Sequence, residues 1–142
     1  MQEASVVDSS NALVASLAVE HWPTLSAAAT RLGMTALSAD LDDCANSHRA
    51  LQHLGKAFVF PEWYGANFDA LADCLSDPEW HAESAGLLLT IRGLETLKHT
   101  NPDDWNTLLE VLRSAAEARS GDGKPFWIIV DTPAPALPRF AP

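Results

Sequence analysis

The residues of this sequence that could do chemistry are carboxylates gathered on one helix-forming segment. Between Lys56 and Arg92 there is no lysine or arginine. The same window contains six acidic residues: Glu62, Asp69, Asp73, Asp77, Glu79 and Glu83. Asp69, Asp73 and Asp77 are spaced i, i+4 and i+8, so on a helix they share one face, where each like-charged pair costs about 0.2–0.5 kcal/mol. A feature that costs stability without a local gain is a candidate functional site, with a solvated acidic helix face as the simpler interpretation.

An enzyme could use such carboxylates for acid/base catalysis or, together with His81, for binding a divalent metal. Three acids at this spacing, however, spread over about 12 Å of helix, which is too far for one ion. The sequence also lacks a CxxC motif, a Cys/His zinc spacing and a nucleophile motif. We therefore expect no catalytic residue, no cofactor and no metal.

Aromatic residues flank the acidic segment and favour recognition of a partner. Trp63 and Tyr64 precede Gly65 before the segment, and Trp80 follows it. Acidic groups beside tryptophan and tyrosine are typical of a hot-spot surface. Because carboxylates resemble phosphates in charge and acceptor geometry, such a surface could occupy a cleft built for RNA and pair with its basic side chains. The alternative is an acidic adaptor that binds a basic protein other than a nuclease.

Charge and composition support a basic protein partner. The chain has 142 residues, 47% of them hydrophobic, which indicates a single globular domain. Nine Lys and Arg against 19 Asp and Glu give a net charge of −10, which argues against nucleic acid and membrane surfaces as partners. The apolar stretch from Ala12 to Val19 is too short to span a bilayer and lacks the flanks of a signal peptide. We expect a cytoplasmic protein, monomeric when free, in which Cys44 and Cys74 are free buried thiols.

The elements that must position these residues alternate between strands and helices. Strands are predicted at 35–41, 87–91 and 126–130 from alternation in the first and branched apolar runs in the others. Strands alternating with helices predict an α/β fold in which a small parallel sheet of about three strands is packed by helices.

Helix-capping residues predict where three helices begin. The caps are Asp42 or Asp43 for the first helix, Asn67 for the second and Asn101 for the third. The second helix has an apolar stripe at i, i+3, i+4 and i+7 that should face the core. That helix carries the acidic residues on another face.

The two ends of the chain are set apart by composition. Residues 1–33 contain one weak helical pattern around Leu13–Ala18 and are not assigned further, so we treat them as an N-terminal extension. Residues 34–131 form the predicted domain. Four prolines fall in the last eleven residues, so residues 132–142 are predicted to be an extended proline-rich tail.

One segment carries a family resemblance. The run PEWYGANFDALADCL at residues 61–75 resembles, without a gap, the P-E-Y-Y-G-x-N-L-D-A-L-x-D-C-L signature of the barstar family, inhibitors of barnase-type ribonucleases. The elements around it fit from residue 34 to residue 131. The resemblance implies a barstar-like fold and an intracellular protein inhibitor of a ribonuclease or related nuclease toxin.

The family's inhibitory loop and helix match this sequence at Trp63, Gly65, Asn67, Asp69 and Asp73. By resemblance, Asp73 enters the phosphate site of the nuclease, Asp69 pairs with a basic residue beside it, and Trp63 packs on the cleft.

The sequence also departs from the family pattern in two places. Ala72 stands where the family has a tryptophan, and Ser114 stands where its last helix has an acid. Glu110 and Glu117, one turn either side, are candidates to replace that acid. Trp80 is a candidate to replace a family tryptophan that lies slightly earlier, and we count it among the expected partner contacts.

Overall fold

The computed structural model describes residues 12–44, 46–135 and 137–140. Its four parallel strands are β1 (Ala12–Ser16), β2 (Thr35–Asp40), β3 (Leu87–Arg92) and β4 (Phe126–Val130), in the order β1-β4-β3-β2. The helices are η1 (Val19–His21), α2 (Trp22–Arg31), α3 (Ser47–Ala57), α4 (Phe68–Ser76), α5 (Leu94–Thr100) and α6 (Pro102–Arg119). The predicted parallel α/β fold is confirmed, with four strands in place of about three.

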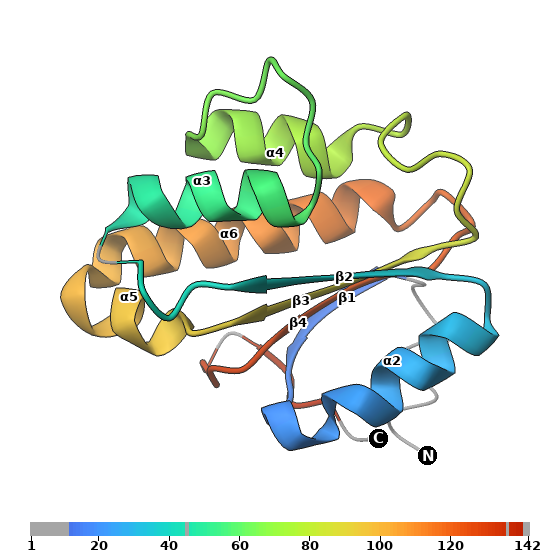
Figure 1. Ribbon diagram of the computed structural model, residues 1–142, viewed down its shortest axis with the longest axis horizontal. Helices are drawn as coiled ribbons and strands as arrows, with labels where there is room; N and C mark the ends of the chain where they lie inside the picture. The colour runs from blue at the N-terminus through green and yellow to red at the C-terminus, as the bar shows by residue number, and fades with distance from the viewer. Residues whose placement is uncertain (1–11, 45, 136, 141–142) are drawn as a thin grey trace.

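Helices cover both faces of the sheet (Figure 1). On one face lie α3, α4, α5 and α6, and on the other lies α2. The central strand β4 alternates between them: Phe126, Ile128 and Val130 pack in the core under α3–α6, while Trp127 and Ile129 pack in the core under α2. This double burial explains why β3 and β4 are continuous apolar runs.

The N-terminal segment, to which the sequence assigns no element, contributes a strand. Despite the weak helical pattern at Leu13–Ala18, residues 12–16 form the edge strand β1, whose register pairs Ala12 with Phe126. The helix α2 then buries Trp22, Leu25 and Ala29 against the second face of the sheet. Periodicity alone cannot assign a short apolar run to a helix or a strand. Residues 12–16 form a strand because β4 offers them a partner for backbone hydrogen bonds. Residues 1–11 of the predicted extension lie outside the described residues.

The proline-rich tail returns to the sheet. The backbone N–H of Ser16 donates a hydrogen bond to the carbonyl of Pro138 at 3.0 Å, and the Ser16 carbonyl accepts a hydrogen bond from the backbone N–H of Phe140 at 2.7 Å. Leu137 is buried in the larger core. The tail therefore pairs with the last residue of β1 and covers that end of an edge strand, where unpaired backbone groups would otherwise be open to another chain. Residues 136, 141 and 142 of the tail lie outside the described part.

Two of the predicted helix caps are confirmed and one is wrong. Asn67 accepts a hydrogen bond from the backbone N–H of Ala70 at 2.7 Å, and Asn101 caps α6 in the same way. The helix α3 is capped by Asn46 and not by Asp42 or Asp43. Those two aspartates belong to the turn that leaves β2, where Asp42 lies 3.6 Å from Arg92. The short helix α5 was not predicted.

Both cysteines are free and buried, as expected. Burial, followed by the negative charges of Asp73 and Asp77, raises the pKa of the Cys74 thiol from its usual value to about 11. The thiol is therefore protonated at neutral pH, which fits a packing role for Cys74 in the core.

This raised pKa makes the stability of the protein sensitive to alkaline pH. Above the ordinary thiol pKa the unfolded chain loses the Cys74 proton and the folded chain keeps it, so the free energy of unfolding falls as pH rises. We expect Cys74→Ala to reduce this fall between about pH 9 and about pH 11, measured by urea unfolding at each pH. If the free energy of unfolding falls equally with pH in wild type and Cys74→Ala, titration of other groups causes the loss of stability.

Candidate functional site

The loop of residues 58–67, between α3 and α4, is held by a cluster of aromatic side chains. The ring of Phe60 lies 4.8 Å from that of Tyr64 and 5.0 Å from that of Trp80, measured between centroids. The Tyr64 hydroxyl donates a hydrogen bond to the backbone carbonyl of Leu51 in α3 at 2.7 Å. Burial raises the pKa of Tyr64 well above its usual range, so this hydroxyl remains a donor. The loop is thereby fixed to α3.

A glycine in α3 makes room for this attachment. A Cβ atom on Gly55 would lie 2.6 Å from Cε2 of Tyr64, inside the contact distance of two carbon atoms. The ring cannot easily move away, because its hydroxyl is hydrogen-bonded and its face packs on Phe60. Gly55 is therefore required by the close approach of the loop.

We predict that Gly55→Ala destabilises the protein by about 1–3 kcal/mol, the usual cost of overpacking. The direction is informative, because alanine in a helix interior ordinarily stabilises by about 0.5–1 kcal/mol over glycine. The control for the packing effect is Gly121→Ala, in the turn after α6, where an added Cβ meets nothing within 4 Å. Urea unfolding of both variants measures the difference, and a stabilising Gly55→Ala would show that Tyr64 is not fixed as described.

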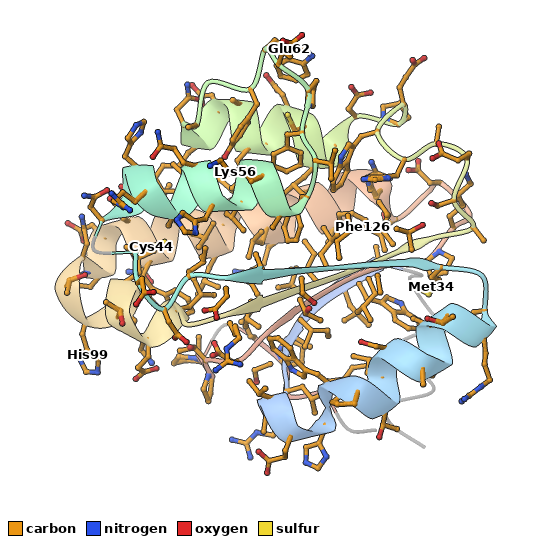
Figure 2. The ribbon with its side chains drawn as sticks, viewed as in Figure 1. Met34, Cys44, Lys56, Glu62, His99 and Phe126 are labelled. Atoms are coloured by element: carbon orange, nitrogen blue, oxygen red, sulfur yellow. The ribbon has the colours of Figure 1, made fainter. Side chains whose placement is uncertain are left out.

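The loop presents a large aromatic side chain to solvent. Trp63 is 57% exposed, whereas the other four tryptophans, including Trp80, are buried. Gly65 is also exposed, and Figure 2 shows Glu62 at the top of the loop. An exposed tryptophan on a loop held by a packed aromatic base is suited to insertion into a partner's pocket.

The helix α4 carries two free carboxylates directly after the loop. Asn67 uses its side-chain oxygen to cap this helix, and Asp69 lies in the first turn, where the helix dipole favours a negative charge. Asp69 and Asp73 are both exposed. Neither side chain forms an ion pair or hydrogen bond with another residue in the described part of the chain. Both are therefore available to a cationic partner.

Asp77, the third acid on the helix face predicted to carry Asp69 and Asp73, has a different role. Its side chain is half-buried, and Oδ1 accepts a hydrogen bond from the backbone N–H of Glu79 at 2.9 Å. It forms the C-terminal cap of α4. The free carboxylates of the acidic face are thus those of Asp69 and Asp73.

The structure also corrects the expected role of Trp80. Its side chain is only 8% exposed, packs against Phe58 and Phe60, and donates from Nε1 to the carbonyl of Phe58 at 3.1 Å. A side chain in this position supports the 58–67 loop from beneath and is not presented to a partner. Trp80 therefore does not contribute to the surface that we expect a partner to contact.

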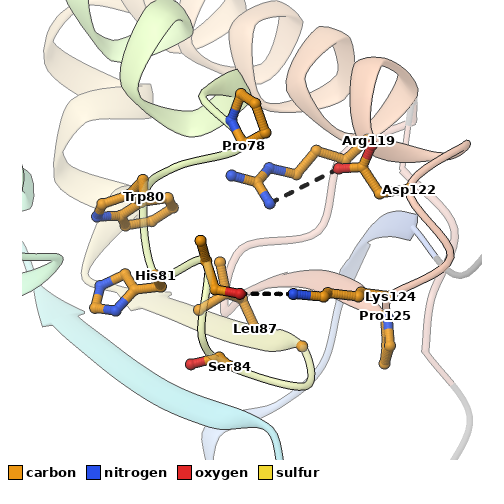
Figure 3. Close-up of a pocket in the computed structure, with 11 residues that line it drawn as sticks. Pro78, Trp80, His81, Ser84, Leu87, Arg119, Asp122, Lys124 and Pro125 are labelled. Atoms are coloured by element: carbon orange, nitrogen blue, oxygen red, sulfur yellow. Dashed lines mark hydrogen bonds and ion pairs between the residues drawn. The ribbon is translucent and has the colours of Figure 1, made fainter.

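Arg119 is a site-supporting residue that the sequence did not reveal. From the end of α6, its Nε donates to the carbonyl of Leu75 and its Nη2 to the carbonyl of Asp77, both at 2.6 Å. Figure 3 shows the Arg119 guanidinium between Pro78 and Asp122, with the ion pair that it forms with Asp122. Burial lowers the pKa of its guanidinium, an effect opposed by Asp122 and Asp77. Arg119 thus satisfies carbonyls at the C-terminal end of α4 and holds the helix that presents Asp69 and Asp73. Its partners are 42 to 44 residues away in the sequence, so no local pattern indicates them.

An anchored aromatic loop is thus followed directly by an acidic helix. A protein family matches the part of the chain that contains both elements. Residues 34–131 match the family described as barstar (barnase inhibitor). The chain belongs to the barstar family. The match includes the whole 58–67 loop and α4, and the family that it identifies is described by inhibition of barnase.

Two departures from the barstar family pattern can be located in the fold. Ala72, in place of the family tryptophan, is half-buried in α4. Ser114 and its neighbours Glu110 and Glu117 are exposed on α6, the helix that packs against α4.

Solved structures show similarity in fold alone. The ORC2 protein of Aeropyrum pernix matches in its ADP form with a TM-score of 0.55 and 17% identity, covering 92% of this chain and 39% of that one. Its ADPNP-ADP complexes match with a TM-score of 0.51 and 20% identity, covering 76% of this chain and 28% of that one. This chain therefore spans well under half the length of those proteins. A comparison with curated proteins finds no match.

Neither a metal cluster nor a membrane span occurs in the part of the chain that the structure describes. No three His, Cys, Asp or Glu side chains in those residues are arranged to hold an ion. No helix there is both long and apolar enough to cross a bilayer.

Proposed function

We propose that this protein inhibits a basic ribonuclease or related nuclease toxin in the cytoplasm by filling its active site with the 58–67 loop and α4. In this proposal Asp73 takes the place of a substrate phosphate, Asp69 pairs with a basic residue beside it, and Trp63 packs on the wall of the cleft. Gly65 allows the loop to approach closely, and Asn67 fixes the start of the helix.

The observation that carries the proposal is the pair of exposed carboxylates on a rigidly held helix. The side chains of Asp69 and Asp73 have no partner among the described residues, yet the helix beneath them is fixed at both ends, by Asn67 and by Arg119. Groups held in place before binding lose little entropy when the complex forms. Family membership supports the same role, because the family is described by barnase inhibition.

Affinity capture with matched baits tests the proposal. Wild-type protein and an Asp69→Ala/Asp73→Ala variant are each immobilised and exposed to a lysate and culture medium of the source cell. The expected result is a basic protein retained by wild type alone, whose RNA-cleaving activity falls stoichiometrically as free wild-type protein is added. Capture of a basic protein without nuclease activity would instead support the acidic adaptor. Barnase serves as a second probe, because the family is named for it.

Association with the nuclease should be fast and sensitive to salt. A chain of net charge −10 attracts a basic partner over long distances, and salt screens this attraction. We expect the association rate constant to fall steeply from low to physiological ionic strength while the dissociation rate constant changes less, as measured by stopped-flow fluorescence. A rate constant that stays flat across that range would contradict contact through the acidic face.

A further inference from the structure

An open groove of about 780 Å³ lies between α3 and the 58–67 loop, beside the proposed inhibitory surface. Its α3 wall carries four basic side chains: His48, Arg49, His53 and Lys56. Its other wall includes Val59, Phe60 and Tyr64, and it ends at Gly65 and Ala66. Figure 2 shows Lys56 on α3 and Glu62 on the loop above it. We call this feature the α3 groove.

The charge of the α3 groove is opposite to that of the protein. The chain has 19 acidic and 9 basic residues, yet no acidic residue lines this groove. All four basic side chains are exposed, and none of them forms a hydrogen bond or ion pair with another described residue. Several other cations of the chain are engaged: Arg92 lies near two aspartates, and Lys98 and Lys124 donate to backbone carbonyls. The basic wall is therefore free to bind an anionic group.

The loop wall adds an exposed apolar contact held in an unfavourable backbone conformation. Val59 is 65% exposed and has a φ of 57°. A β-branched residue in the left-handed region is strained, and such strain persists where the surrounding structure imposes it, often at binding sites. Ala66, at the far end of the groove, also has a positive φ of 55°. The groove thus combines a cationic wall with an apolar, conformationally fixed one.

The overall charge of the protein limits what can enter this groove. A net charge of −10 disfavours large polyanions such as nucleic acids, because their charge interacts with the whole protein and not with the groove alone. A basic protein is attracted at long range and can still bring a local acidic segment into contact. The groove shares Tyr64, Gly65 and Ala66 with the loop that would enter the nuclease. The same partner therefore reaches both surfaces.

We propose that the α3 groove binds an acidic segment of the inhibited nuclease, outside its active site, with carboxylates on Arg49 and Lys56 and an apolar side chain on Val59 and Phe60. This proposal rests on the proposed function. It assigns α3 a part in selecting among nucleases, because complementary charges across an interface favour one partner over others.

A peptide experiment tests the groove without any nuclease. The probes are an acidic peptide, Asp-Glu-Phe-Glu-Asp, and its amide counterpart, Asn-Gln-Phe-Gln-Asn, both capped at their ends and titrated into the full chain by NMR. We expect saturable shifts of the α3 and Val59 amide signals with the acidic peptide alone. We also expect these shifts to disappear in Arg49→Glu/Lys56→Glu. Equal binding of the two peptides, or shifts away from the groove, would overturn the proposal.

A second measurement uses the nuclease captured by the wild-type bait. Arg49→Glu/Lys56→Glu is compared with Arg31→Glu/Arg139→Glu, which changes the net charge equally at two exposed residues that do not line the groove. We expect the groove variant to dissociate about tenfold faster than the control, since loss of close charge pairs acts on dissociation. Equal dissociation rates would overturn the proposal. If the peptide binds but no nuclease is captured, the proposed function fails while the groove's preference for acidic segments stands.

Discussion

Asp73→Ala is expected to weaken binding of the nuclease by about 2–5 kcal/mol, or roughly thirty-fold to several thousand-fold in affinity, while leaving the protein as stable as before. This range of binding free energies is general for the truncation of one partner in a buried charge pair, and measurements on the barnase–barstar complex are among those that define it. In the free protein the Asp73 side chain is exposed and has no partner among the described residues, so its loss changes the free energy of unfolding by no more than a few tenths of a kcal/mol. In the complex it would face desolvated basic side chains, which truncation leaves buried and unpaired.

The control for this variant must remove the same charge elsewhere. Glu20→Ala is suitable, because Glu20 is exposed in η1, beside α2 and on the face of the sheet opposite α4 (Figure 1). Asp77→Ala is unsuitable, because it also removes the hydrogen bond to the backbone of Glu79. Urea unfolding and surface-based affinity measurements on both variants separate binding from folding. If Asp73→Ala binds as tightly as Glu20→Ala, phosphate mimicry by Asp73 is wrong.

Trp80→Ala is expected to reduce the free energy of unfolding by about 3–5 kcal/mol, the usual cost of deleting a large buried aromatic side chain. The indole packs against Phe58 and Phe60 and satisfies the carbonyl of Phe58, and both interactions are lost together. Trp80→Phe keeps most of the packing and should cost less. Urea unfolding monitored by circular dichroism measures both variants.

Trp63→Ala is expected to have the opposite effects: it should weaken binding and leave the free energy of unfolding almost unchanged. Because Trp63 is 57% exposed, its removal should change stability by less than about 0.5 kcal/mol while weakening nuclease binding by about 2 kcal/mol or more. If Trp80→Ala leaves stability unchanged and weakens binding, the sequence-based view of Trp80 as a partner contact is restored and the packing described here is wrong.

The sequence by itself determined the features that depend on neighbours along the chain. Asn67 and Asn101 cap helices because their side chains reach a backbone N–H three residues ahead. The runs at 87–91 and 126–130 are short, rich in branched apolar residues and bounded by glycine or proline, which is enough to predict strands. The match of residues 61–75 to the barstar pattern likewise located Asp69 and Asp73 together with the loop that precedes them.

Only the tertiary structure decided which of the remaining residues lie at the surface and which lie beneath it. Residues 12–16 became a strand because β4 offered an open edge, and Trp80 became part of the core because Phe58 and Phe60 lie 20 or more residues upstream and pack on it. Arg119 and the α3 groove likewise depend on contacts between separate elements. Local patterns report which face of an element is apolar, whereas burial is set by the partner element that covers this face, and the partner is chosen by packing across the whole chain.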